Sequence, residues 1–202
     1  MKKFTKIEKE TSNPYLNLYH MEAMDREENA FDYYYVSRRE EKNLRVVTKD
    51  LIPEGIVIYA VTKEKHPRLV LIREYRYPLG DYIYAMPAGL IDEGETPGAA
   101  AKREIREETG LNFEEYKEGK EYYRKPFFIA PGFSDEANCA VFGTVENQMQ
   151  SQQCEVSERI EVILADKEMV QKILMEEKVS LRGAYLMFLY LNDAGNGLSF
   201  LY

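Results

Sequence analysis

The sequence predicts an α/β (α+β) sandwich, in which strands flank one central helix and further helices close the chain. Three observations support this class. Strand-like segments lie on both sides of a strongly capped helical pattern at 96–109, two more helical patterns occupy 166–191, and the regular strand–helix alternation of a parallel sheet is missing. The 202 residues, 45% of them apolar, are enough to bury a substantial core.

The first 45 residues differ from the rest and are expected to form an N-terminal extension, with the main domain at 46–202. Tyr15–Met21 and Phe31–Val36 are rich in strand-forming aromatics, and the polar turn Asp25–Asn29 separates them, which is typical of a β-hairpin. A lone hairpin is marginally stable, so it should pack on the main domain or on a partner chain. The run Tyr33–Tyr35 is interpreted as strand core or dimer interface, with nucleobase stacking as the alternative.

The helix at Thr96–Thr109 has the clearest local signals. Thr96 is a typical N-cap, Pro97 occupies the first helical position, and Gly110 supplies the stop. Around it, the expected strands and then the expected helices are, in order, Gly55–Val61, Leu69–Arg73, Tyr82–Met86, Phe127–Ala130, Asn138–Val145 and Glu158–Leu164, followed by Asp166–Glu177 and Ser180–Leu191.

The charge balance limits the function. The chain has 35 acidic against 27 basic residues, a formal net charge of −8, which argues against binding DNA or RNA phosphates. A small phosphorylated ligand held through a metal ion remains compatible with this charge. Two cysteines make no disulfide framework, no signal-peptide pattern opens the sequence, and the longest apolar run, Ala184–Leu191, is too short to span a bilayer. We therefore expect a cytoplasmic protein without a membrane partner.

A group of glutamates on the central helix carries the chemical signal. Glu104, Glu107 and Glu108 stand at i, i+3 and i+4 and share one helix face, where like charges repel by roughly 0.2–0.5 kcal/mol per pair. They also lie in the last turn, at the negative end of the helix dipole. Local stability does not favour this arrangement, but a divalent cation would neutralise it. Oxygen ligands without His or Cys indicate Mg²⁺ first and Mn²⁺ next. The alternative is a solvated charged face.

The spacing around these glutamates resembles the Nudix box. The segment Gly89–Leu111, GLIDEGETPGAAAKREIREETGL, matches the box at each of its defined positions. The resemblance implies a mixed β-sheet sandwiched between helices, and hydrolysis of a nucleoside diphosphate linked to another moiety with the help of divalent metals.

The resemblance also implies roles for single residues. Glu104 and Glu108 would be the main metal ligands, Glu107 a further ligand or a residue that positions water, and the Ala88 carbonyl a further ligand. Glu95 and Arg103 would form the ion pair that holds the loop to the helix. The remaining structural positions of the box are Gly89 and Gly110.

Segments outside the box resemble the ADP-ribose pyrophosphatase branch of this family. They are Tyr75–Leu79, Met86–Asp92 and Pro131–Glu136. The branch uses an N-terminal extension for dimerisation, which fits residues 1–45 and predicts a homodimer. The resemblance implies substrate contacts by Arg76, Gly132 and Glu136.

Two positions near the predicted site need separate comment. The stretch Glu155–Val162 resembles the segment where this branch carries its catalytic base, and Glu158 aligns best, with Glu155 second. The sequence also departs from the branch, because Ala85 stands where a glutamate is usual, two residues before Pro87. The substrate is therefore less firmly indicated than the enzyme class.

The leading hypothesis is an enzyme that splits ADP-ribose into AMP and ribose 5-phosphate with Mg²⁺. GDP-mannose or a flavin or dinucleoside substrate is an alternative within the family. A non-catalytic ligand sensor on the same fold is an alternative of another class, and a purely structural dimer module is a third. The complete set of box carboxylates speaks against both non-enzymatic hypotheses.

Overall fold

The computed structural model describes residues 3–146 and 148–202, which divide into two units. The first unit comprises Met1–Glu54 and Pro126–Asn138, and the second comprises Gly55–Lys125 and Cys139–Tyr202. The chain thus enters the first unit twice. The expected domain boundary after residue 45 stays a prediction, and residues 46–54 and 126–138 group with the N-terminal strands.

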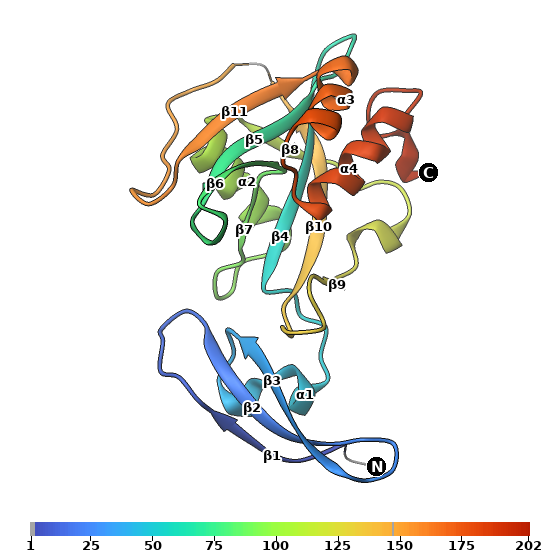
Figure 1. The fold of residues 1–202 in the computed structure, drawn as a ribbon. Helices are drawn as coiled ribbons and strands as arrows, with labels where there is room; N and C mark the ends of the chain where they lie inside the picture. Colours follow the sequence, from blue (N-terminus) through green and yellow to red (C-terminus); the bar gives the residue numbers. More distant parts are fainter. Residues whose placement is uncertain (1–2, 147) are drawn as a thin grey trace. The chain divides into compact units, whose positions relative to one another are not determined.

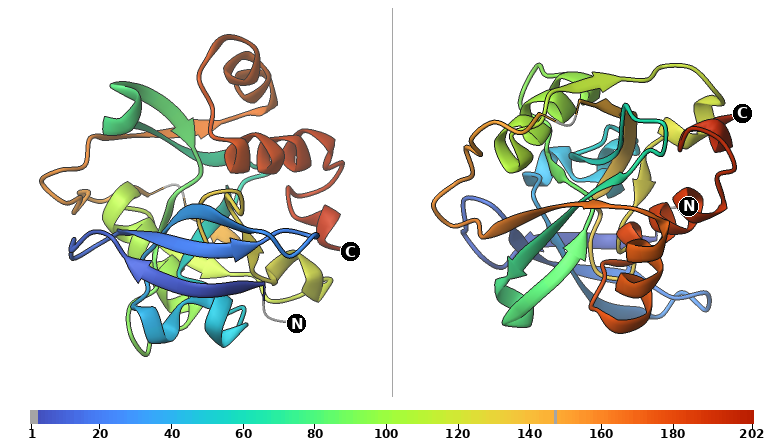
Figure 2. Two further views of the ribbon diagram at one scale, coloured as in Figure 1. Left: turned by 60° about the horizontal axis from the view of Figure 1, so that its bottom comes forward. Right: turned by 90° about the horizontal axis from the view of Figure 1, so that it is seen from above.

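The first unit is built on an antiparallel sheet of order β1-β2-β3, with β1 at Phe4–Lys9, β2 at Asn17–Met24 and β3 at Ala30–Ser37 (Figure 1; Figure 2, left, blue). The β2–β3 hairpin confirms the prediction. Strand β1 was not predicted, because its sequence FTKIEK mixes charged and apolar residues without a clean apolar face.

One face of this sheet has a small core of its own. Tyr19 and Tyr35 are buried and stack at 5.7 Å between ring centroids, and Leu44 packs with them. Leu44 lies between η1 (Glu41–Asn43) and the short helix α1 (Arg45–Thr48). Strand β1 and this helical segment therefore stabilise the β2–β3 hairpin from within the same chain.

The second unit is a sheet between helices. Its strands follow the path β11-β5-β4-β10-β8, with β6 on β5 and β7 on β4 (Figure 1). The strands and helices are β4 (Gly55–Thr62), β5 (Leu69–Arg76), η2 (Tyr77–Leu79), β6 (Asp81–Ala85), β7 (Ala88–Leu90), α2 (Pro97–Thr109), β8 (Phe113–Glu115), η3 (Glu121–Arg124), β10 (Ala137–Val145), β11 (Ile160–Ala165), α3 (Lys167–Glu176), α4 (Leu181–Asn192) and η4 (Ser199–Leu201). Strand β9 (Phe127–Phe128) belongs to the first unit, as do its partners Ala137 and Asn138 at the start of β10, and it is shorter than the predicted Phe127–Ala130.

Strand β4 shows why the sheet needs helices on both faces. Its eight residues are all buried, and successive side chains point to opposite faces. Val57, Tyr59 and Val61 pack in the core that contains Val170 of α3 and Met187 of α4. The alternate residues of β4, Ile56, Ile58 and Ala60, pack in the core that contains Ala100, Ala101 and Ile105 of α2. This arrangement confirms the predicted sandwich.

The helix caps follow the sequence signals. The Thr96 hydroxyl accepts a hydrogen bond from Ala99 N at 3.3 Å, and Gly110 ends α2 with φ of +69°. Asp166 and Ser180 cap α3 and α4 in the same way. None of the helices in the described part of the chain has both the length and the apolarity that crossing a bilayer would require.

We expect the buried Asp193 to stabilise the C-terminal segment in a pH-dependent way. Its Oδ1 accepts from the backbone N–H of Gly195 and Gly197, and its Oδ2 accepts from Ser199 Oγ at 2.6 Å and Phe200 N at 2.9 Å. Burial acts to raise the pKa of Asp193, but these hydrogen bonds outweigh it and the pKa lies below its ordinary value of 3.8.

Asp193→Asn should therefore lower the free energy of unfolding by about 1–3 kcal/mol at pH 7. The NH₂ group of the asparagine would replace one carboxylate oxygen and would face the two donors that this oxygen accepts from. A depressed carboxyl pKa stabilises the fold above the unfolded value, and this stability is lost as the pH falls through the folded value. The difference between wild type and variant in urea unfolding should shrink below about pH 4. A difference that persists unchanged to pH 2 would contradict this account.

Candidate active site

Arg103 lies at the centre of the predicted box, on α2. Its Nη2 binds Glu95 Oε2 at 2.9 Å and its Nε binds Glu95 Oε1 at 3.2 Å, a bidentate pair. The same guanidinium donates to the Leu90 carbonyl at 3.0 Å, and its Nη1 contacts Glu104 at 2.7 Å and Glu107 at 3.3 Å. One side chain thus ties the loop after β7 to the helix and faces two of the three clustered glutamates.

Glu108 is the most buried carboxylate of the box, with 4% of its surface exposed. Burial raises its pKa well above the ordinary value, and the neighbouring charges of Glu104, Glu74 and Glu158 raise it further. A hydrogen bond of 3.3 Å from the Ala88 backbone N–H to Glu108 Oε2 acts in the opposite direction. An ionised carboxylate in such surroundings calls for a positive partner.

Glu104 stands beside it against the Gly89 backbone. Burial raises its pKa, and the Arg103 hydrogen bond works in the opposite direction. A side chain at position 89 would place its Cβ 1.9 Å from Glu104 Oε1, so glycine is needed for this carboxylate to lie where it does. The loop and the helix therefore determine together where the Glu104 carboxylate stands.

The residues fit a hard divalent cation. The donors available are carboxylate oxygens of Glu104, Glu107 and Glu108 and the Ala88 carbonyl, with no sulfur or imidazole among them. The buried Glu108 charge has no cationic side chain bound to it among the described residues, and this is the observation that favours a metal. In the arrangement described, the box glutamates do not bring three ligand oxygens within 4.8 Å of one another.

The two candidate base residues differ in position. The Glu158 carboxylate is among the charges that raise the pKa of both Glu104 and Glu108. Its Oε2 accepts a hydrogen bond from the Glu155 backbone N–H at 2.9 Å. Both side chains lie in the exposed segment before β11. The negative charge of Glu158 acts on Glu104 and Glu108, which makes it the better candidate of the two.

The predicted substrate residues fall in both units. Arg76, at the end of β5, is half-exposed and pairs with Glu74 at 3.1 Å. Gly132 and Glu136 belong to the first unit, where the Gly132 carbonyl accepts from Tyr33 Oη and Glu136 pairs with Arg38. The structure thus brings together Glu104, Glu107, Glu108, Ala88, Gly89, Glu95 and Arg103, and places Glu158 and Arg76 in the same unit.

Two residues near the cluster were not predicted. Glu74 adds a negative charge near Glu108 and links it to Arg76. The Gln152 side-chain amide donates to the Glu108 carbonyl at 2.5 Å and to the Ile160 carbonyl at 3.4 Å, which joins the end of α2 to β11. The sequence offered a signal only for Glu74, which precedes Arg76 by two residues and so points to the same face of the strand.

This chain is similar to several known proteins. The chain is 40% identical over 121 residues to "Putative nudix hydrolase 2" of Caenorhabditis elegans, a match covering 56% of this chain and 52% of that protein. The chain thus spans about half the length of this relative. It is also 29% identical over 168 residues to an ADP-ribose pyrophosphatase of Bacillus subtilis, covering 79% of this chain and 85% of the relative.

A solved structure and a family model complete the comparison. The crystal structure of an ADP compounds hydrolase matches the fold with a TM-score of 0.58 at 17% identity, covering 86% of this chain and 82% of that one. The NUDIX domain model matches residues 51–177, which include the whole box and the segment of Glu155 and Glu158. The chain belongs to the NUDIX family.

Proposed function

We propose that this protein hydrolyses the pyrophosphate bond of a nucleoside diphosphate sugar, with ADP-ribose as the leading substrate and AMP and ribose 5-phosphate as products. The proposal depends on a divalent cation, Mg²⁺ first and Mn²⁺ next. The observation that carries it is the buried Glu108 carboxylate beside Glu104, whose charges destabilise each other unless a cation binds.

The predicted site residues each have a part in this proposal. Glu104 and Glu108 hold the cation, Glu107 adds a ligand or orients a water, and the Ala88 carbonyl contributes an oxygen. When bound, the cation neutralises the phosphate oxygens and lowers the pKa of a bound water. Arg103 keeps Glu104 and Glu107 in place through the contacts described above, and Glu95 fixes Arg103. Arg76 at the end of β5 offers a guanidinium suited to a phosphate.

The choice of ADP-ribose as the leading substrate rests on the similarity of this chain to named relatives. Several relatives carry the name ADP-ribose pyrophosphatase, including the proteins of Bacillus subtilis and Saccharomyces cerevisiae. The yeast protein is 37% identical over 117 residues, covering 54% of this chain and 48% of the relative. GDP-mannose is the runner-up within the family.

A hydrolysis screen tests the proposal. Purified protein is incubated with ADP-ribose, ADP-glucose, GDP-mannose and a dinucleoside polyphosphate, with Mg²⁺, with Mn²⁺ and with a chelator. We expect the largest kcat/KM for ADP-ribose and loss of turnover with the chelator. Turnover of none of these compounds under any condition would reject the enzyme and favour a ligand sensor, which calorimetry with the same compounds would reveal.

Glu158→Gln should lower kcat far more than Glu155→Gln. A general base contributes roughly 10²–10⁴-fold to a rate, and Glu158 is the candidate whose charge reaches Glu104 and Glu108. Equal losses in the two variants, or a larger loss in Glu155→Gln, would contradict the assignment.

We also propose a homodimer formed through the extension at residues 1–45, in a reducing compartment such as the cytoplasm, where the free thiols of Cys139 and Cys154 persist. The exposed aromatics Phe31 and Tyr33, which share one face of β3, support a contact surface there. Light scattering at micromolar concentration should give twice the mass of 23.6 kDa. A monomeric mass would reject the dimer and leave the hydrolase proposal intact.

A further inference from the structure

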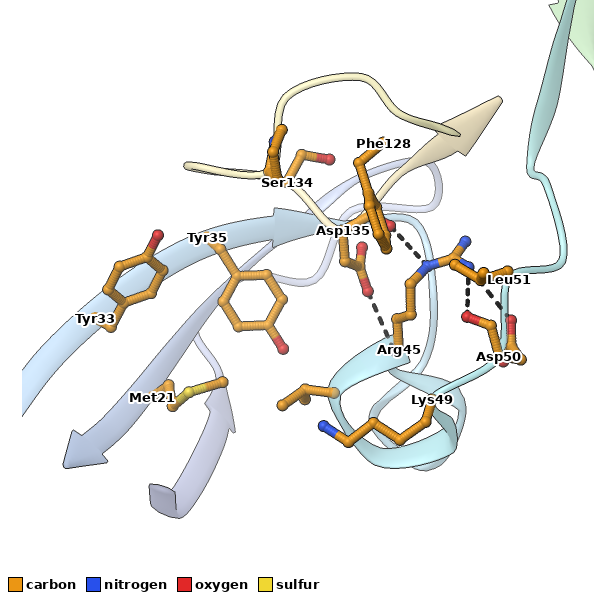
Figure 3. Close-up of a pocket in the computed structure, with 12 residues that line it drawn as sticks. Met21, Tyr33, Tyr35, Arg45, Lys49, Asp50, Leu51, Phe128, Ser134 and Asp135 are labelled. Atoms are coloured by element: carbon orange, nitrogen blue, oxygen red, sulfur yellow. Dashed lines mark hydrogen bonds and ion pairs between the residues drawn. The ribbon is translucent and has the colours of Figure 1, made fainter. Parts of the chain in front are cut away.

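Ion pairs of two kinds occur in the protein, and Arg45 in the first unit shows the permanent kind. Arg45 is 5% exposed, and its Nη2 binds both Glu54 carboxylate oxygens at 2.7 Å. Its Nη1 donates to the Asp50 carbonyl at 2.8 Å, and its Nε donates to the Asp135 carbonyl at 2.8 Å (Figure 3). Removing one partner would leave a buried charge uncompensated, so these groups stay together.

Arg76 in the second unit has a weaker ion pair. Among the described residues, one hydrogen bond of 3.1 Å joins Arg76 Nη1 to Glu74 Oε2. The Arg76 side chain is 53% exposed, whereas that of Glu74 is 18% exposed. A pair with one exposed member contributes little to stability, so it opens at small cost when either charge finds another partner.

Glu74 and Arg76 point to the face of the sheet that α2 covers. Val70, on the same strand, packs in the core that contains Ile105 of α2. Leu71, the next residue, packs in the core that contains residues of α3 and α4. Because successive residues of a strand point to opposite faces, Glu74 and Arg76 share the face of Val70.

A chain of contacts joins Glu74 to the end of α2, where Glu108 lies. Ile160 of β11 is directly opposite Glu74 in the antiparallel ladder. The Gln152 amide donates to the Ile160 carbonyl at 3.4 Å and to the Glu108 carbonyl at 2.5 Å. Burial raises the pKa of Glu108, and the charges of Glu104 and Glu74 raise it further. The carboxylate that pairs with Arg76 therefore also acts on the buried carboxylate of the box.

We propose that Glu74 is shared between two positive partners, pairing with Arg76 before a cation binds and with the cation of the box afterwards. The inference rests on the proposed function, because the divalent cation and the phosphate of that proposal are the incoming groups. When Glu74 turns to the cation that Glu104 and Glu108 hold, the Arg76 guanidinium is free to bind a phosphate oxygen. Because such coupling is reciprocal, a phosphate bound to Arg76 also strengthens cation binding.

Mn²⁺ binding to the full-length protein without substrate tests this sharing. Electron paramagnetic resonance measures the free ion, and the site of interest is the one that is lost in Glu108→Gln. Glu74→Gln should weaken that site about 10-fold, the low end of the loss typical of groups that support a metal ligand. Arg76→Gln should tighten it about 2- to 5-fold, because Glu74 then has no competing partner.

Arg73 and Glu161 provide a matched control pair. They are opposite each other on β5 and β11 and pair at 3.1 Å. Arg73 is adjacent to Glu74 in the strand, so this pair lies on the other face of the sheet, away from α2. Arg73→Gln and Glu161→Gln change the net charge by the same amounts as the test variants. At physiological ionic strength they should leave the Mn²⁺ affinity of the box within about 2-fold of wild type.

The double variant Glu74→Gln/Arg76→Gln separates sharing from a general effect of charge. Removing Arg76 should tighten Mn²⁺ binding less when Glu74 is already replaced, because no carboxylate is released. An equal gain in both backgrounds, or a wild-type affinity in Glu74→Gln, would overturn the inference and leave the hydrolase proposal standing.

The hydrolysis screen and the Mn²⁺ titration can fail independently. Opposite shifts in Glu74→Gln and Arg76→Gln, in a protein that hydrolyses none of the screened compounds, would reject the proposed function and support the shared carboxylate. Wild-type protein that binds no Mn²⁺ at the site of Glu108 would reject both the metal-dependent proposal and this inference.

Discussion

Replacing Glu108 with glutamine is expected to lower kcat/KM for ADP-ribose by at least about 100-fold, more than the 10- to 100-fold typical of losing a group that only supports a metal ligand. The substitution keeps the shape of the side chain and removes its charge. Steady-state kinetics across a Mg²⁺ titration is the measurement. A Glu176→Gln variant serves as the control, because Glu176 is an exposed glutamate at the end of another helix, α3.

The same variant should behave in the opposite direction in a stability assay. A carboxyl whose pKa is raised by folding binds its proton more tightly in the native state, so stability without metal falls as the pH rises above the ordinary value of 4.5. Glu108→Gln lacks this decline and should unfold at higher urea than wild type at pH 8 with a chelator present. Added Mg²⁺ should stabilise wild type and not the variant. Full activity in Glu108→Gln would refute the ligand assignment.

Gly110→Ala is expected to destabilise the fold by about 2–5 kcal/mol, which combines left-handed backbone strain with a steric clash. Gly110 ends α2 at φ of +69°, and an added Cβ would lie 2.1 Å from the Gln150 carbonyl oxygen. That contact is with backbone, and the Gln150 N–H in turn donates to the Gly110 carbonyl at 2.9 Å. Urea denaturation measures the loss.

Gly80→Ala provides the matched comparison. Gly80 also adopts a left-handed conformation, at φ of +60°, where it ends η2, but apart from its chain neighbours no atom of the described residues lies within 4 Å of its Cβ position. This variant should lose only the strain, roughly 1–2 kcal/mol. The difference between the two variants measures the clash at Gly110. Equal losses would show that the approach of Gln150 is relieved at no cost.

The parts of this fold that follow from local sequence were predictable. Thr96, Pro97 and Gly110 announce the start and end of α2 because their conformational preferences act within a few residues. The glutamate cluster was predictable for the same reason, since helical spacing alone brings Glu104 and Glu108 together. The buried strand β4 was predictable from a continuous run of β-branched and aromatic residues.

The parts that depend on distant residues were not predictable. Arg45 and Asp135 are 90 residues apart, and nothing in the sequence around either one indicates the other. Strand β1 forms because it can pair with the edge of β2, and this pairing overrides the weak strand pattern of the β1 sequence. The charge of Glu74 acts on the pKa of Glu108 only once the sheet and α2 have packed together. Site residues that come from one helix can be predicted from the sequence. Their neighbours from distant parts of the chain become known only from the folded structure.

The double passage of the chain through the first unit has a consequence for biosynthesis. A ribosome releases residues 1–54 first, yet the acceptors for Tyr33 and Arg45 lie at Gly132 and Asp135. These two contacts must wait for about 80 further residues, which take some 4–16 s at ordinary rates of synthesis. The N-terminal strands therefore leave the exit tunnel with an incomplete set of partners, and the unit made first is finished only after residues 55–125, the first of the two segments of the second unit, have been translated.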